Sequence, residues 1–291
     1  SGNIYACGST YSADFPTTAG VVCRVRQGSY NAWVAQLNSD ASSLVYSTYI
    51  DGNGGTTANC IVADSDGNAI ICGMTSSTTL PISSTPFCST NKGSWDAFLL
   101  MLNSDATAIR YCTYIGSSGT DGLNALVLDN GLIYAAGYSA GGTDPDVFPI
   151  TTVAYDKVFN GGSNDAVLMV LDLYPEVTFI VGTGGTLDKP SSQKVAMGGD
   201  CSAVKATANS PYAFFSWTTP DGFSSTDNPL TLKNVTKDMV VTANFAPATA
   251  TLTMAKTGTG TVTPASGSQN TLKDISISAT PGAMFHFVKW T

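Results

Sequence analysis

Histidine is nearly missing from this 291-residue chain, since only position 286 carries one. Catalysis that depends on several histidines is therefore excluded. Charge is also scarce: 12% of residues are charged, and 21 acidic residues against 13 basic ones give a net charge of −8. A nucleic-acid binder needs a basic face, so we expect no nucleic-acid partner. No run of 18 apolar residues occurs, and we expect no membrane insertion.

Aromatic and small residues take the place of charge. The chain has 12 Tyr, 12 Phe, 4 Trp, 29 Gly and 13 Pro, and hydrophobic residues make up 43%. Disordered chains combine high charge with few aromatics, so this composition predicts a folded protein. No long stretch shows the 3.6-residue helical period, whereas short apolar runs alternate with turn residues. An all-β fold of many short strands is expected.

An internal repeat organises the first half of the chain. Residues 32–41 (AWVAQLNSDA) return 65 positions later as 97–106 (AFLLMLNSDA), and 165–171 (DAVLMVL) is a weaker third copy. One complete unit is predicted to hold four strands at about 58–63, 69–74, 96–102 and 109–115. Four strands per repeat, separated by turns, are typical of a β-propeller blade. The matched apolar residues of the third strand are expected to pack in the core between blades: Trp33, Phe98 and Val167.

The motifs of this unit resemble a known family. Phe-Pro-Thr-Thr, Leu-Asn-x-Asp and Tyr-x-Thr-Tyr-Ile are similar to the bacterial β-propeller repeat labelled SBBP, over about residues 1–172. The resemblance implies a secreted or surface-exposed propeller and no particular activity. Residues 1–174 are thus predicted to form three blade-type copies, a partial propeller. The first copy begins at its second strand and the third lacks its last one, so either further residues or other copies of the chain are expected to complete the structure.

Two copies of a different unit follow the blades. Gly-Thr-Gly-Thr-Val-Thr-Pro, then Ala-Thr-Pro and an aromatic-x-x-Trp ending, resemble the divergent internalin-type B-repeat of bacterial surface proteins, over about 177–291. Trp217 and Trp290 occupy matched positions, 73 residues apart. The resemblance implies small β-rich modules used in series, predicted at 175–247 and, truncated, at 248–291. The chain is expected to be a segment of a longer protein.

Cysteines recur with the repeat. Cys7 and Cys72 share one matched position, and Cys23 and Cys88 share another, 16 residues downstream. Both positions lose their cysteine together in the third copy, which predicts disulfides Cys7–Cys23 and Cys72–Cys88 and an oxidising, extracellular setting. Buried free thiols are the alternative, since spacing alone does not fix connectivity. The pairing of three further cysteines stays open: Cys60, Cys112 and Cys201.

Few residues suggest a bound ligand. Asp64, Asp66 and Asn68 resemble the start of a calcium loop, but Asp-Gly is a strong hairpin signal, and a turn is the favoured interpretation. Asp144-Pro145-Asp146 is expected to be a solvated loop tip. No cofactor motif occurs, and no cofactor is expected.

The sequence favours a secreted, non-enzymatic scaffold or adhesion protein at the cell surface. Self-association, or binding to other surface proteins, is expected, with strand or blade exchange as a route to a filament or surface layer. The alternative function is an extracellular glycan-binding module, for which Tyr30 and Trp95 would face the ligand. A catalytic part outside this segment, or in the propeller mouth, is a third hypothesis.

Overall fold

We describe a computed structural model of the chain, over residues 2–50, 52–84, 86–141, 148–270 and 273–291. All regular elements in these ranges are β-strands, which confirms the all-β prediction. It follows that these ranges hold no helix with the length and apolar character needed to cross a membrane. The chain divides into two compact units. Unit 1 comprises 1–175 with 195–199 and 234–236, and unit 2 comprises the remainder.

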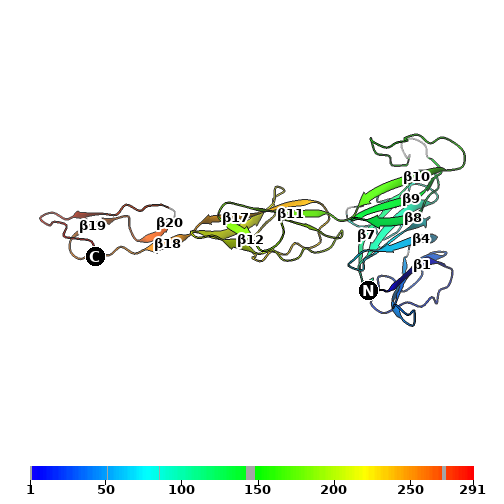
Figure 1. The fold of residues 1–291 in the computed structure, drawn as a ribbon, viewed down its shortest axis with the longest axis horizontal. Helices are drawn as coiled ribbons and strands as arrows, with labels where there is room; N and C mark the ends of the chain where they lie inside the picture. The colour runs from blue at the N-terminus through cyan, green and yellow to red at the C-terminus, as the bar shows by residue number, and fades with distance from the viewer. Residues whose placement is uncertain (1, 51, 85, 142–147, 271–272) are drawn as a thin grey trace. The chain divides into compact units, whose positions relative to one another are not determined.

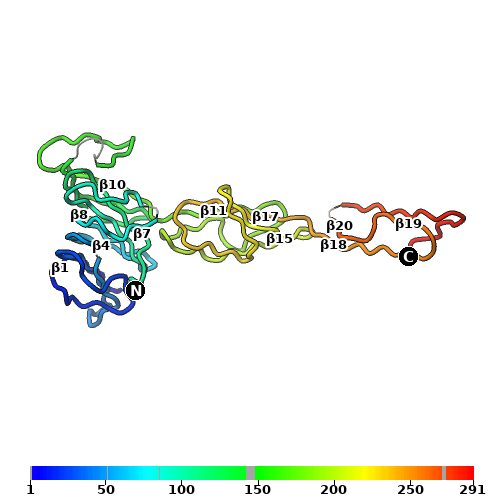
Figure 2. Tube along the Cα trace, turned by 180° about the vertical axis from the view of Figure 1, so that it is seen from behind, coloured from blue at the N-terminus to red at the C-terminus, as the bar shows by residue number. Residues whose placement is uncertain are grey.

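Three antiparallel sheets follow one another in unit 1, running from blue to green in Figures 1 and 2. The first sheet contains β1 (Ile4–Thr10), β2 (Asn31–Leu37) and β3 (Leu44–Ile50). The second sheet contains β4 (Thr56–Ala63), β5 (Ala69–Thr75), β6 (Asp96–Leu102) and β7 (Ile109–Ile115). The third sheet contains β8 (Asp121–Asp129), β9 (Leu132–Ser139) and β10 (Asp165–Asp172). In every sheet, strands adjacent in the chain are adjacent in space.

The second sheet is the complete repeat unit. Its four strands coincide with the four predicted from the sequence, apart from one or two residues at their ends. The third sheet has no strand after β10 that corresponds to β7, as the missing Tyr-x-Thr-Tyr-Ile motif predicted. Closure into a propeller ring is not seen in the described residues; the repeat appears as consecutive stacked sheets.

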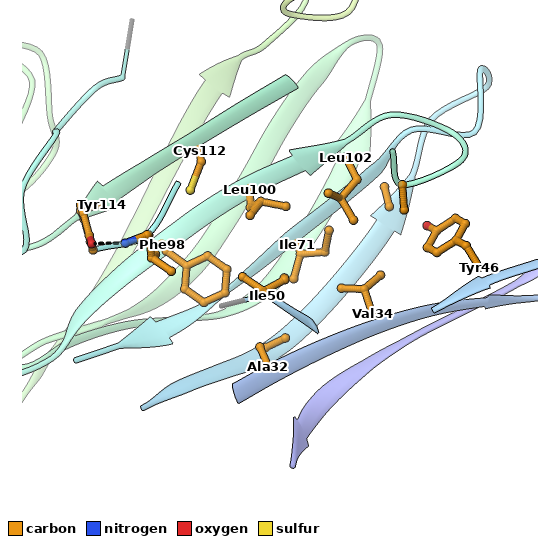
Figure 3. Packing of buried hydrophobic residues seen from close by; sticks show 14 residues of the cluster. Ala32, Val34, Tyr46, Ile50, Ile71, Phe98, Leu100, Leu102, Cys112 and Tyr114 are labelled. Atoms are coloured by element: carbon orange, nitrogen blue, oxygen red, sulfur yellow. Dashed lines mark hydrogen bonds between the residues drawn. The ribbon is translucent and has the colours of Figure 1, made fainter. Parts of the chain in front are cut away.

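The sheets stack through two apolar layers, because alternate residues of each strand point to opposite faces. One layer joins the first and second sheets and includes Val34, Ile71 and Leu100, which converge in Figure 3. The other joins the second and third sheets and includes Leu99 and Ile133. Core packing between repeats is therefore confirmed for the third strand of the second sheet.

The other two matched residues of the third strand are less enclosed. Trp33 and Val167 are half-buried, whereas Phe98 is fully buried between the first and second sheets. Trp33 packs against Phe15, with ring centroids 5.0 Å apart. The loop between β1 and β2 thus covers part of the outer face of the first sheet.

A glycine in the second strand of the repeat is required by a β-bulge in the first strand. Gly73 pairs with Ala58, and the register shifts immediately after this pair. A Cβ atom at Gly73 would lie 1.8 Å from the backbone oxygen of Thr57. Gly137 has the same relation to the bulge in β8, where its Cβ would lie 1.9 Å from the oxygen of Gly122. The recurring glycine is explained by backbone proximity, since any side chain would collide.

Unit 2 begins with a five-stranded mixed sheet in the order β13-β11-β17-β15-β16, in which only β11 and β17 pair in parallel. Its strands are β11 (Glu176–Val181), β13 (Ser192–Lys194), β15 (Tyr212–Thr218), β16 (Ser224–Ser225) and β17 (Met239–Pro247). A two-stranded sheet accompanies it, formed by β12 (Gly185–Leu187) and β14 (Ala206–Ala208). Trp217 is fully buried here, and its Nε1 donates to the Asp227 carbonyl at 2.9 Å.

The last segment of unit 2 forms two further two-stranded antiparallel sheets, whose strands alternate along the chain. Strands β18 (Thr249–Leu252) and β20 (Gly267–Asn270) form one, and β19 (Gly260–Thr263) and β21 (Ser278–Pro281) form the other. Trp290, the counterpart of Trp217, is 43% exposed and packs against Phe287 with ring centroids 5.2 Å apart. The two modules therefore share a sequence pattern but not the same degree of enclosure of their tryptophan.

Candidate functional site

The predicted disulfides Cys7–Cys23 and Cys72–Cys88 are not formed. All seven cysteines lie in the described part of the chain, and none of them is in a disulfide. The sheet order gives the reason. Cys72 lies in β5, whereas Cys88 hydrogen-bonds to β7, where its N–H donates to Thr113 Oγ1 at 2.8 Å. Because β6 separates β5 from β7, the two cysteines are at least two strand spacings, or roughly 10 Å, apart, too far for a disulfide.

The first repeat has the same geometry. Cys7 lies in β1, while the Cys23 N–H donates to Thr48 Oγ1 of β3 at 3.1 Å, on the far side of β2. The joint recurrence of both cysteines therefore reflects a repeated loop that docks on the fourth strand of the unit. The alternative interpretation, buried thiols, describes the second-strand positions: Cys72 is fully buried, and burial raises the pKa of the Cys7 thiol to about 11.

One pair of cysteines is adjacent in the sheet. Cys60 and Cys72 face each other across β4 and β5. Burial raises the pKa of the Cys72 thiol, and the nearby Cys60 raises it further. Cys112 lies in the apolar layer between the first and second sheets, where burial raises its thiol pKa to about 12. Such thiols are poor nucleophiles at neutral pH, because the reactive thiolate is disfavoured.

Asp64 forms the predicted hairpin turn between β4 and β5. Its Oδ1 accepts hydrogen bonds from the backbone N–H groups of Asp66 at 2.9 Å and Asn68 at 2.8 Å. Its Oδ2 accepts from Asn68 Nδ2 at 2.7 Å and from the Tyr174 hydroxyl at 2.9 Å. Gly67 completes the turn with a φ of 84°. Both carboxylate oxygens therefore hold the turn and Tyr174.

In the part of the chain that the structure describes, no group of three or more His, Cys, Asp or Glu comes together to hold a metal ion. Asp144-Pro145-Asp146 lies outside the described residues.

Three aromatic rings form a row across the first two repeats. Tyr30 contacts Tyr11 with ring centroids 4.9 Å apart, and it stacks on Trp95 at 6.2 Å with an interplanar angle of 27°. Tyr11 is 75% exposed, and the other two rings are half-buried. Gly55 permits this approach, since a Cβ there would lie 2.8 Å from the Tyr30 ring and 2.9 Å from that of Trp95. The structure thus brings together the two predicted ligand-facing aromatics and adds Tyr11, whose position in the loop gave no sequence signal.

Tyr30 and Trp95 also connect neighbouring sheets through their backbones. The Tyr30 carbonyl accepts from the Thr56 N–H at 3.1 Å, and the Trp95 carbonyl accepts from the Asp121 N–H at 2.8 Å. Tyr30 and Trp95 each lie immediately before the third strand of one repeat. Their donors, Thr56 and Asp121, each begin the first strand of the next repeat. The aromatic position therefore has a structural role in joining repeats.

A buried carboxylate closes the turn next to Trp95. Asp96 has no exposed surface, and its oxygens accept the N–H groups of Lys92 at 2.8 Å and Gly93 at 3.0 Å. Burial raises the pKa of Asp96 to about 6, against the lowering effect of these hydrogen bonds, and the nearby Asp121 carboxylate raises it further. The matched residue of the first repeat is Asn31. Sequence reasoning missed this group, because Asp96 reads as an ordinary residue beside a Gly-Ser turn.

A cavity of about 220 Å³ lies between the first and second sheets. Apolar groups such as Ile50 and Leu100 line it, together with Cys23 and Tyr49.

Comparison with known proteins finds a similarity for the C-terminal part of the chain. Residues 176–249 and 250–291 match the model of the divergent InlB B-repeat domain. The chain is thus a tandem β-repeat protein whose C-terminal part consists of two segments similar to this domain, as predicted from the sequence. No curated protein matches the chain.

Proposed function

We propose that the protein is a secreted, non-enzymatic scaffold or adhesion protein of a bacterial surface, built from blade-type sheets followed by B-repeat modules. The stacking of consecutive repeat sheets through shared apolar layers is the observation that carries this proposal. In repeat proteins, each unit buries its apolar faces against its neighbours, so length and surface are gained by addition of units.

Two resemblances support a surface location. The family matched by 176–291 is typical of surface or extracellular bacterial proteins. The motifs of residues 1–172 resemble SBBP propeller repeats, which points to the same compartment. The composition fits as well, since Ser, Thr, Gly and Asn supply most of the polarity of a chain with 12% charged residues.

A structural role fits the polar groups that are buried. The carboxylate oxygens of half-buried Asp64 and of fully buried Asp96 accept hydrogen bonds within turns, and burial raises the pKa of the Cys72 thiol. The repeated faces of the sheets instead suit self-association or contact with other surface proteins.

Surface localisation tests this proposal. Intact cells that make the protein are treated with protease, and the surviving chain is measured by immunoblot, with a cytoplasmic protein as the control. We expect the chain to be degraded while the control survives. Protection of both proteins in intact cells, with degradation of both after lysis, would refute the surface assignment.

The aromatic row favours a second candidate, a glycan-binding module. Tyr11, Tyr30 and Trp95 present neighbouring rings at the surface of unit 1. Aromatic faces are common platforms in ligand sites. Glycan-array binding that is lost in Trp95→Ala, and kept in Phe87→Ala at another exposed aromatic, would support this function. Absence of binding by the wild-type chain would rule it out.

A further inference from the structure

Each sheet of unit 1 has a forward face, toward the next sheet in the chain, and a rear face, toward the preceding one. The forward face of the second sheet contains Val62, Ile70, Leu99 and Met101, which pack in the layer against the third sheet. The last three are completely buried. Forward faces therefore meet rear faces at both sheet–sheet contacts of the chain.

The third sheet carries the same forward face without a covering sheet. Its matched residues lie in register across β8, β9 and β10, where Val127 and Val170 both pair with Tyr134, and Leu168 pairs with Ala136. The exposed fractions are 58% for Val127, 36% for Tyr134, 75% for Leu168 and 54% for Val170. Four large apolar side chains in adjacent strands form a patch of the kind that marks an interaction surface.

The first sheet offers the complementary rear face. Its Ile4, Ala6 and Leu37 share one face, since Ile4 pairs with Leu37 and the strand alternates. Ile4 is 42% exposed, and the other two are half-buried. The matched residues of the second sheet, by contrast, are completely buried against the first sheet: Ala69, Ile71 and Leu102.

We propose that the forward face of the third sheet binds the rear face of the first sheet in a second copy of this chain. The proposal rests on the self-association in the proposed function and assigns its surface. The internal contacts between sheets are the template, because the same positions already form this contact twice. An asymmetric contact of this kind is head-to-tail, so repeated docking extends into chains or rings of subunits.

The physical driving force is apolar burial between two faces whose centres are apolar. The forward-face positions are Val, Tyr, Ala, Leu and Val, and the rear-face positions are Ile, Ala and Leu. Neither set contains a charge whose desolvation would oppose docking. Two carboxylates lie at one edge of the forward face, at Asp129 and Asp172, which both pair with Leu132, and they leave its centre apolar. Symmetric pairing of two forward faces has no precedent within the chain.

Sedimentation velocity on the full chain, over about a hundredfold range of concentration, tests the contact. Leu168→Asp blocks the forward face, and Ile4→Asp blocks the rear face. Ile180→Asp is the matched control, because Ile180 is an exposed strand residue of unit 2, at 46%. We expect wild type and the control to exceed the monomer mass of 30.0 kDa progressively, and each blocked variant to remain monomeric at every concentration.

Mixing the two blocked variants tests whether the contact is head-to-tail. Each retains one functional face, so an equimolar mixture is expected to give a dimer and nothing larger. A monomeric wild type would overturn the proposal. So would association of Ile4→Asp equal to that of wild type, which would indicate symmetric pairing of third sheets. Circular dichroism and melting temperatures should match among variants, and Leu168→Lys repeats the forward-face test if Leu168→Asp melts earlier.

The outcomes separate this inference from the proposed function. A protein that is monomeric in solution but degraded on intact cells would keep its surface role and lose this contact. A protein that forms head-to-tail chains but is protected inside cells would keep the contact and lose the surface role.

Discussion

The buried carboxylate of Asp96 should make the folding stability of the protein depend on pH. Burial raises the pKa of Asp96 from 3.8 to about 6. The folded state therefore binds a proton more tightly than the unfolded state does. Stability from this group is fully present below the unfolded pKa near 4, and is lost as the pH rises through about 6. Integrated over this window at 1.36 kcal/mol per pKa unit, the loss reaches at most about 3 kcal/mol.

Asp96→Asn removes the titration while keeping the shape. The amide imitates the protonated acid, and Asn31 already occupies the matched position of the first repeat. One of the two hydrogen bonds from Lys92 and Gly93 loses its acceptor, so the variant is expected to be the less stable protein at about pH 4.5. By pH 7 this deficit should shrink or reverse, with a change of up to about 3 kcal/mol in the difference between the proteins.

Hydrogen exchange measured by mass spectrometry on peptides from β6 reports the opening free energy at this site, after correction for the intrinsic pH dependence of exchange. Asp105→Asn is the control. Hydrogen bonds from Thr107 lower the pKa of Asp105, whose titration therefore falls below this window. An equal difference between Asp96→Asn and wild type at both pH values would refute the reasoning.

Three further predictions concern packing, backbone and thiols. Leu99→Ala, in the layer between the second and third sheets, should destabilise unit 1 by about 2–5 kcal/mol in urea unfolding, whereas Leu168→Ala at the matched exposed position should cost far less. Gly73→Ala should lower the melting temperature sharply, because its Cβ would collide with the Thr57 oxygen, and an unchanged melt would contradict the bulge explanation. Alkylation of the unreduced, denatured protein should modify all seven cysteines, and mass spectrometry that finds fewer would show a disulfide. In the folded protein, the fully buried Cys72 and Cys112 should be the slowest to react.

The strands of the repeat could be predicted because several local signals agree. In the unit from β4 to β7, apolar runs of strand length alternate with Asp-Gly and Asn-Ser-Asp turns, and the repeat marks equivalent positions. The resemblance of the C-terminal part could be predicted as well, because its Gly-Thr motifs and matched tryptophans indicated the family that residues 176–291 match.

The details of the site depend on three-dimensional relations that the repeat does not encode. Cys72 and Cys88 recur together, but only the strand order reveals that β6 lies between them. Tyr11 joins the aromatic row through a loop whose path has no periodic signal. The raised pKa of Asp96 follows from complete burial by neighbouring turns, which composition and spacing do not show.

The distinct forward and rear faces of each sheet have a consequence for how the number of repeats in the gene can change. A duplicated 65-residue unit would bring its own forward face and its own rear face, and so would offer both of the contacts that its new neighbours use. Unequal recombination between the related stretches at 32–41 and 97–106 would then alter the number of units in one event. A change in the number of whole units leaves each apolar layer with a face on both sides, so this architecture accommodates it more easily than substitutions at individual core positions.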